Sequence, residues 1–277
     1  ERLVIPLKRA DGLLLVEATI DSMAGNFILD TGAPYLVLNK TYFRNGKQAD
    51  GSWSGGVTGG TSAVLHTTVD RLQIQELFYR NVAADVVNLG HIENDKGIKI
   101  FGMLGANLFS DMEMEIDVRN SVLYLYKINR NGDRLSAVSD PPDVKKDLQI
   151  PLEVLNNIVF VNATVGKSKL RFCLDTGAEV SVLSNDVNNK VLETFHLVSR
   201  NTLMGSGNKK VEVLGGELEL LTIGDHAFPR MQAILTGLGG LQSLYNTSLQ
   251  GILGFNFLDQ GRVLINIQKK QLTMYFY

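Results

Sequence analysis

The chain has 277 residues, of which 44% are hydrophobic and 20% charged, and this composition is typical of a folded globular protein rather than a disordered one. The formal net charge is −2 and no long run of Lys or Arg occurs, so nothing indicates nucleic acid or an anionic membrane as the main partner. The apolar stretches are far shorter than the roughly 20 residues that a helix needs to cross a bilayer, so no membrane span is predicted.

The single cysteine and the four histidines indicate neither a disulfide nor a metal site in this sequence. Cys173 excludes an internal disulfide, and its setting between Phe172 and Leu174 predicts a small buried apolar residue. The histidines show no metal-ligand spacing, such as a pair four residues apart. We therefore expect no metal site and no cofactor.

The predicted elements are mainly short strands. In the first half, β-branched or aromatic segments bounded by Gly, Asp and Asn predict strands at 13–16, 18–20, 27–29 and 122–126. Helical periodicity is scarce, and short helices are predicted only at 106–111, 186–194 and 255–259. The sequence therefore favours a mostly β fold.

The chain is an internal duplication. Residues 4–38 align without a gap on residues 149–183, and this places Asp30-Thr31-Gly32-Ala33 on Asp175-Thr176-Gly177-Ala178. After a short insertion in the second copy, the repeat continues with 102–105 on 251–254 and runs to the end of each half. Each Asp-Thr-Gly-Ala turn follows an apolar strand that ends in Leu.

The segment between the two copies is polar, contains Pro141-Pro142, and has no counterpart in either copy. These features are typical of a linker. We therefore expect an N-terminal lobe at 1–126, a linker at 127–148 and a C-terminal lobe at 149–277.

Asp and Gly are frequent in turns, so one Asp-Thr-Gly turn by itself has an ordinary structural explanation. Two copies at matched positions of a duplicated chain favour a functional role for Asp30 and Asp175. Two carboxyls that share a site cannot both ionise and hold one proton between them. The ionised partner can then act as a base on water while the protonated partner acts as an acid.

The neighbouring residue types suit such a pair. Glycine allows backbone amides to approach a carboxylate, and a threonine hydroxyl can donate a hydrogen bond to the backbone of the other half. A glycine in a second segment allows close packing against the turn. The residues expected in these supporting roles are Thr31, Gly32, Ala33, Thr176, Gly177 and Ala178 in the turns, and Gly105 and Gly254 in the packing segments.

The Asp-Thr-Gly-Ala turn, followed by a Gly-rich segment and then by Gly-Met-Leu-Gly-Ala-Asn-Leu or Gly-Ile-Leu-Gly-Phe-Asn-Phe, resembles the unit of retropepsin-type aspartic peptidases, present twice in one chain. The resemblance covers nearly everything except the linker. It implies two β-barrel lobes related by a pseudo-two-fold axis, with an active-site cleft between them and Asp30 and Asp175 as the catalytic pair. It also implies an aspartic endopeptidase that acts on peptide or protein substrates, without a cofactor and as a monomer.

The same resemblance implies a Gly-rich β-hairpin flap in each lobe. By position, the flap candidates lie at 54–61 and 203–208. The candidate substrate-binding residues in them are Val57, Thr58, Gly59, Gly60, Met204, Gly205, Ser206 and Gly207. Gly-rich hairpins also occur without any role in binding, so their contact with substrate stays open.

Some features differ from the pepsin-like branch of these enzymes. Ala33 and Ala178 stand where pepsin-like enzymes generally have Ser or Thr, and no tyrosine lies between Phe43 and Tyr79, where their flap tyrosine would be. The chain therefore resembles a fused retropepsin dimer more than a pepsin. The alternative function is a peptide-binding module that kept the fold with little or no turnover.

The residues leave the compartment open. Similarity to bacterial retropepsin-type sequences, together with a start at Glu1 rather than Met, favours an exported protein of the bacterial periplasm or cell envelope.

Overall fold

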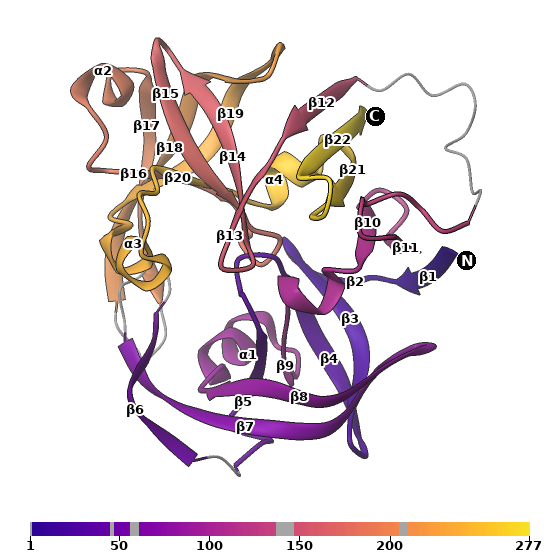
Figure 1. Ribbon diagram of the computed structural model, residues 1–277. Helices are drawn as coiled ribbons and strands as arrows, with labels where there is room; N and C mark the ends of the chain where they lie inside the picture. Colours follow the sequence, from indigo (N-terminus) through magenta and orange to yellow (C-terminus); the bar gives the residue numbers. More distant parts are fainter. Residues whose placement is uncertain (1, 45–46, 56–60, 137–146, 205–209) are drawn as a thin grey trace.

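The structure is a computed structural model that describes residues 2–44, 47–55, 61–136, 147–204 and 210–277. It consists mainly of strands, arranged in two eight-stranded sheets and one six-stranded sheet (Figure 1). One eight-stranded sheet comes from each half of the chain, and the six-stranded sheet contains strands from both halves. The expected mostly β, two-lobed architecture is therefore confirmed.

The sheet of the first lobe has the order β2-β3-β4-β9-β5-β8-β7-β6. An additional pairing of β3 with β7 folds this sheet back on itself, which leaves most of β3 buried. The strands are β2 (Lys8–Ala10), β3 (Leu13–Ile20), β4 (Met23–Asp30), β5 (Leu36–Asn39), β6 (Lys47–Gly55), β7 (Thr61–Ile74), β8 (Leu77–Val87) and β9 (Gly102–Gly105).

The sheet of the second lobe has the order β13-β14-β15-β20-β16-β19-β18-β17, and β14 makes the additional pairing with β18. Each position in this order is filled by the repeat counterpart of the strand in the first lobe, so the duplication of the sequence is also a duplication of the topology. The strands are β13 (Glu153–Leu155), β14 (Ile158–Val165), β15 (Ser168–Leu174), β16 (Ser181–Ser184), β17 (Phe195–Met204), β18 (Lys210–Ile223), β19 (His226–Thr236) and β20 (Gly251–Leu253).

The six-stranded sheet joins the lobes with the order β1-β11-β10-β21-β22-β12. The strands are β1 (Arg2–Pro6), β10 (Met112–Asp117), β11 (Val122–Lys127), β12 (Leu148–Pro151), β21 (Gly261–Asn266) and β22 (Gln271–Phe276). In the central pairing, Met114 lies opposite Ile265 and Ile116 lies opposite Val263. Met114 and Ile116 are the repeat counterparts of Val263 and Ile265, so the register is symmetric and the pseudo-two-fold axis passes between β10 and β21.

The first and last strands of each half therefore pair with each other, β1 with β11 and β12 with β22, and the two halves meet where β10 pairs with β21. Figure 1 shows this sheet on one side of the molecule, between the first lobe in indigo and magenta and the second lobe in orange. Strand β11 ends at Lys127 and β12 begins at Leu148, so both strands extend slightly into the expected linker.

The helices are short. The predicted helices at 106–111, 186–194 and 255–259 correspond to the 3-10 helix η1 (Ala106–Phe109), α2 (Asn189–Leu192) and α4 (Phe255–Leu258), while α1 (Gly90–Lys96) and α3 (Gly239–Tyr245) were not predicted. The N-caps of α1 and α3 are Leu89 and Leu238, and neither makes a side-chain capping bond. The usual sequence signal for a helix start is therefore missing. No helix in the described part of the chain is long and apolar enough to cross a membrane.

The hydrophobic core follows the repeat. One large cluster of buried side chains includes residues from both lobes, and a smaller cluster lies in each lobe beside α1 or α3. Cys173 belongs to the small cluster of the second lobe and is 1% exposed, while its repeat counterpart Ile28 belongs to that of the first lobe. The prediction that Cys173 is a buried apolar residue is confirmed.

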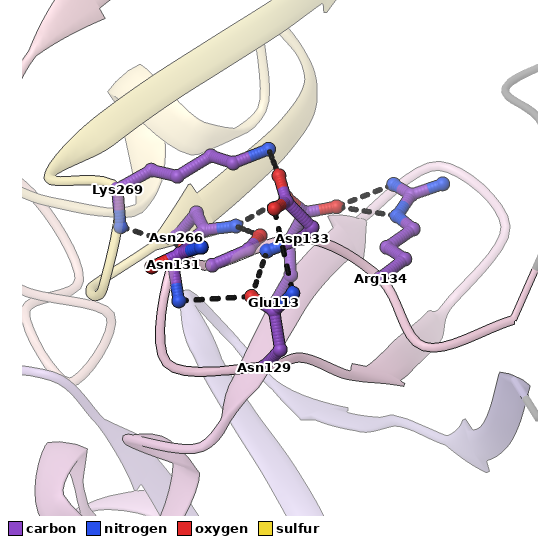
Figure 2. Close-up of polar contacts among 8 residues, drawn as sticks. Glu113, Asn129, Asn131, Asp133, Arg134, Asn266 and Lys269 are labelled. Atoms are coloured by element: carbon purple, nitrogen blue, oxygen red, sulfur yellow. Dashed lines mark hydrogen bonds and ion pairs between the residues drawn. The ribbon is translucent and has the colours of Figure 1, made fainter.

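The chain after β11 is attached to the second lobe, as Figure 2 shows. The side-chain oxygen of Asn129 accepts hydrogen bonds from the backbone amides of Asn131 at 2.8 Å and Asp133 at 2.9 Å, which close a tight loop. The carboxylate of Asp133 pairs with Nζ of Lys269 at 2.8 Å. The first part of the expected linker is therefore a contact between the lobes rather than a free connection.

Asn266 lies at the centre of this contact and is 2% exposed. Its Nδ2 donates to Oε2 of Glu113 on β10 at 2.7 Å and to the carbonyl oxygen of Gly132 at 2.9 Å. Its Oδ1 accepts a hydrogen bond from the amide of Lys269 at 2.9 Å. One side chain therefore connects β10, β21 and the loop that follows β11.

We predict that Asn266→Ala lowers the free energy of unfolding by about 3 kcal/mol, because it leaves several buried polar groups without a partner. The measurement is urea unfolding followed by circular dichroism. Asn162→Ala is the matched control, because exposed Asn162 donates only to Glu153 at the surface, and a change within about 0.5 kcal/mol is expected. Equal effects of the two substitutions would contradict a central role for Asn266.

Candidate active site

The two Asp-Thr-Gly-Ala turns follow central strands of their lobes. Asp30 is the last residue of β4 and pairs with Gly105 of the parallel strand β9. Asp175 directly follows β15, which pairs in parallel with β20. Because the pseudo-two-fold axis relates the lobes, the two turns face each other.

Hydrogen bonds cross between the two turns. The hydroxyl of Thr31 donates to the carbonyl oxygen of Leu174 at 2.7 Å and accepts from the amide of Thr176 at 3.1 Å. The hydroxyl of Thr176 donates to the carbonyl oxygen of Leu29 at 2.6 Å and accepts from the amide of Thr31 at 3.0 Å. Both hydroxyls therefore make the predicted bonds to the opposite backbone, and the two turns are held in one fixed arrangement.

Gly32 and Gly177 bring each carboxyl against the opposite turn. A Cβ on Gly32 would lie 2.5 Å from Cγ of Asp175, and one on Gly177 would lie 2.7 Å from Cγ of Asp30. Any larger residue would therefore displace the carboxyl of the other lobe. The amides also approach as predicted, since Gly32 donates to Oδ1 of Asp30 at 2.9 Å and Gly177 donates to Oδ1 of Asp175 at 2.8 Å.

The environment of the pair favours retention of a proton. Asp30 is 9% exposed, and Asp175 is partly exposed. Burial, and then the charge of Asp175 and a hydrogen bond with it, raise the pKa of Asp30 well above its ordinary value, against the backbone amides of Gly32 and Ala33. Burial also raises the pKa of Asp175, although the hydrogen bond with Asp30 and nearby backbone amides act in the opposite direction. Each carboxyl therefore affects the ionisation of the other.

Gly105 and Gly254 allow the predicted close packing of a second segment in each lobe. A Cβ on Gly105 would lie 2.2 Å from the carbonyl oxygen of Tyr35, and one on Gly254 would lie 2.7 Å from that of Ala178. The residues after these glycines, Ala106 and Phe255, donate their amides to the carbonyl oxygens of Ala33 and Ala178 at 2.9 and 2.8 Å. These bonds attach the end of each turn to the body of its lobe.

The flap candidates lie almost entirely outside the described residues. This applies to Val57, Thr58, Gly59, Gly60, Gly205, Ser206 and Gly207, whereas Met204 is the last residue of β17. The strands on either side of each candidate are antiparallel partners, with Gly55 opposite Thr61 and Met204 opposite Lys210. The contact of these residues with substrate stays a prediction.

Sequence reasoning missed two side chains that reach a turn from the opposite lobe. The hydroxyl of Tyr245, the last residue of α3, donates to the carbonyl oxygen of Gly32 at 2.8 Å. Nζ of Lys96, the last residue of α1, lies 2.8 Å from Oε2 of Glu179 and 2.9 Å from Oδ2 of Asp11. Tyr245 and Lys96 occupy equivalent positions of the repeat but differ in residue type. The comparison of the two copies therefore did not mark either of them as a candidate site residue.

In the described residues, no group of three or more His, Cys, Asp or Glu side chains is arranged to hold a metal ion.

We predict that Thr31→Val lowers the free energy of unfolding by about 2 to 4 kcal/mol, because it keeps the shape of the side chain but leaves the carbonyl of Leu174 and the amide of Thr176 buried without a partner. Thermal and urea unfolding measure this loss. Thr31→Ser is the control, since it retains the hydroxyl and should retain most of the stability. If the Val variant were as stable as the Ser variant, the crossed hydrogen bonds would not hold the turns together.

The raised pKa of Asp30 leads to a second prediction, which concerns how the free energy of unfolding depends on pH. Because this pKa is higher in the folded than in the unfolded chain, the folded protein binds more protons between the two values, and its stability falls as the pH rises through that window. Asp30→Asn removes this effect and should stabilise the protein at neutral pH, with the gain lost near pH 3, below the ordinary pKa of Asp. Urea unfolding at both pH values is the measurement. A variant less stable than wild type at neutral pH would show that the fold gains from the ionised pair.

Comparisons with known proteins agree with this geometry. The sequence profile described as Aspartyl protease matches the chain twice, over residues 16–108 and 161–257. No curated protein matches the chain. Among solved structures, the aspartic proteinase from Irpex lacteus is similar over 100% of this chain and 97% of its own, with a TM-score of 0.58 and 12% sequence identity.

At this sequence identity the structural similarity shows only that the two proteins share a fold. The shared fold has two lobes. Each profile match contains one Asp-Thr-Gly-Ala turn and the Gly that packs behind it. The matched residues make up more than half of the chain. The chain therefore belongs to the aspartyl protease family, with two retropepsin-like units in one polypeptide, and family and fold together support a protease function.

Proposed function

We propose that this protein is an aspartic endopeptidase that cleaves peptide bonds with water activated between Asp30 and Asp175. The observation that carries the proposal is that carboxyls from separate lobes share a buried site in which the pKa of both is raised. Their loops are locked by the crossed bonds of Thr31 and Thr176. Raised pKa values of two buried acids are typical of catalytic sites.

Two carboxyls with one proton can perform both halves of the hydrolysis. The ionised carboxyl takes a proton from water as the water oxygen attacks the peptide carbonyl, and the protonated carboxyl donates to the developing oxyanion. Proton transfer to the peptide nitrogen then allows the C–N bond to break. This division of roles is the established behaviour of aspartic proteases, in which like charges about 3 Å apart cannot both ionise.

The backbone fixes the orientation of the pair. Oδ1 of Asp30 accepts hydrogen bonds from the amides of Gly32 at 2.9 Å and Ala33 at 3.0 Å, and Oδ1 of Asp175 accepts one from Gly177 at 2.8 Å. One oxygen of each carboxyl is therefore held by its own turn. A fixed pair of this kind favours catalysis because little reorganisation is needed at the moment of reaction.

We predict that Asp30→Asn and Asp175→Asn each abolish hydrolysis, because one carboxyl cannot serve as both base and acid. The assay is incubation of the protein with a diverse peptide mixture from about pH 3 to about pH 8, the range that covers the titration of carboxyl pairs, with cut sites identified by mass spectrometry. Circular dichroism checks that both variants fold.

The shared-pair mechanism would be wrong if either variant kept more than about a tenth of the wild-type kcat, since a factor of ten corresponds to only about 1.4 kcal/mol. Binding of peptides by the wild-type protein without any cleavage would instead identify a peptide-binding module that retains the fold.

We also predict that the protein works as a monomer, because one chain supplies both carboxyls and both halves of the six-stranded sheet. Activity per mole of chain should stay constant on dilution, and sedimentation should give one species of 30.5 kDa. A specific activity that rises in proportion to protein concentration would point to an obligate dimer instead.

A further inference from the structure

Tyr245 connects the second lobe to the catalytic turn of the first. It ends helix α3, is 8% exposed, and donates its hydroxyl to the carbonyl oxygen of Gly32 at 2.8 Å. Helix α3 also lies against β6, the strand that leads to the first flap candidate. The phenol is therefore held by its own lobe while its hydrogen bond crosses to the other.

The bond to Gly32 continues to the carboxyl pair through one peptide group. The carbonyl of Gly32 and the amide of Ala33 belong to the same planar peptide unit, and that amide donates to Oδ1 of Asp30 at 3.0 Å. The chain of bonds thus runs from the phenol of Tyr245, through the peptide, to the carboxylate. Hydrogen bonds in such a chain polarise one another, so a donor on the carbonyl strengthens the amide as a donor.

In the described part of the chain, no phenol makes the equivalent bond to the second turn. The repeat counterpart of Tyr245 is Lys96, whose ammonium group pairs with the carboxylate of Glu179 at 2.8 Å. The side chain of Lys96 is 8% exposed, so this contact is also built into the interface between the lobes. The helices α1 and α3 therefore both reach across the interface, but only Tyr245 bonds to the peptide that holds a catalytic carboxyl.

We propose that Tyr245 is a positioning residue of the carboxyl pair, which orients the Gly32–Ala33 peptide and strengthens its hydrogen bond to ionised Asp30, so that the pair becomes more acidic. This role compensates in part for Ala33, which offers no side-chain hydroxyl beside the carboxyl. The inference rests on the proposed function for its effect on catalysis, whereas its effect on acidity can be measured without turnover.

The groups around the phenol allow this role. The titratable groups that act on Tyr245 are Asp30, Asp175 and Cys173. Arg171 acts on Cys173, and the Glu179–Lys96 ion pair lies at the end of the second turn. Burial, and then the charges of Asp175 and Asp30, raise the pKa of Tyr245, so the phenol keeps its proton and remains a donor. Burial also raises the pKa of the Cys173 thiol, which therefore stays neutral.

The test is an NMR titration of the whole chain labelled with ¹³C at the aspartate carboxyls, with the signals of the pair assigned from Asp30→Asn and Asp175→Asn. Tyr245→Phe removes only the hydroxyl. A weaker Ala33 donor favours the ionised form less, so the pKa values of the pair should rise by about half a unit. The acid limb of kcat/KM should move to higher pH by the same amount.

Tyr79→Phe is the matched control, because the hydroxyl of Tyr79 also donates to a backbone carbonyl, that of Leu108, at 2.7 Å, away from the pair. It should give a similar loss of thermal stability with no change in the titration of the pair. Site-specific incorporation of 3-fluorotyrosine at position 245 covers the case that the Phe variant does not fold. A fluorinated phenol is a stronger donor, so the pKa values should shift downward.

The outcomes separate this inference from the proposed function. If the titration of the pair is the same in the wild type and in the folded Tyr245→Phe or fluorotyrosine protein, the positioning role is wrong, whether or not the protein cleaves peptides. If the titration shifts as expected but no peptide is cleaved, the positioning role stands and the proposed function fails.

Discussion

The crossed hydrogen bonds of Thr31 and Thr176 are the interaction on which the rest of the site depends. They fix two acidic loops from separate lobes at a distance where their carboxyls share a buried space. Two like charges in such a place repel each other and favour separation of the loops. Each threonine uses its hydroxyl as donor and acceptor at once, so the buried backbone groups of both loops are satisfied only when the loops are together.

The six-stranded sheet sets the geometry that these bonds complete. Its strand order is a palindrome of repeat counterparts, and the central pair β10–β21 has a symmetric register. Backbone hydrogen bonds along this sheet therefore fix how one lobe is rotated relative to the other. The outer strands β1 and β12 come from the beginning of each half, and each pairs with the last strand of its own half, β11 or β22.

The fused chain also allows differences that a symmetric dimer would forbid. In a dimer of identical units, every contact across the axis occurs twice. Here Lys96 and Tyr245 occupy equivalent places but bind a carboxylate in one case and a carbonyl in the other. Asn266 similarly binds the loop after β11, whereas its counterpart Asp117 caps the turn at Asn120. The asymmetry provides different surroundings for two carboxyls of the same type.

The sequence by itself determined the duplication, the mostly β character, the two acidic turns and the residues that support them. These features are local or repeated, since an Asp-Thr-Gly-Ala turn after an apolar strand has the same meaning in both halves.

Only the tertiary structure decided which side chains meet across the interface. Helices α1 and α3 lack a polar N-cap, so the usual sequence signal for a helix start is missing, although each ends at a residue typical of helix ends, Gly97 or Asn246. Tyr245 and Gly32 are far apart in the chain, and their bond exists because two lobes dock in one register. Contacts of this kind depend on the positions of many other residues, and for that physical reason no local pattern encodes them.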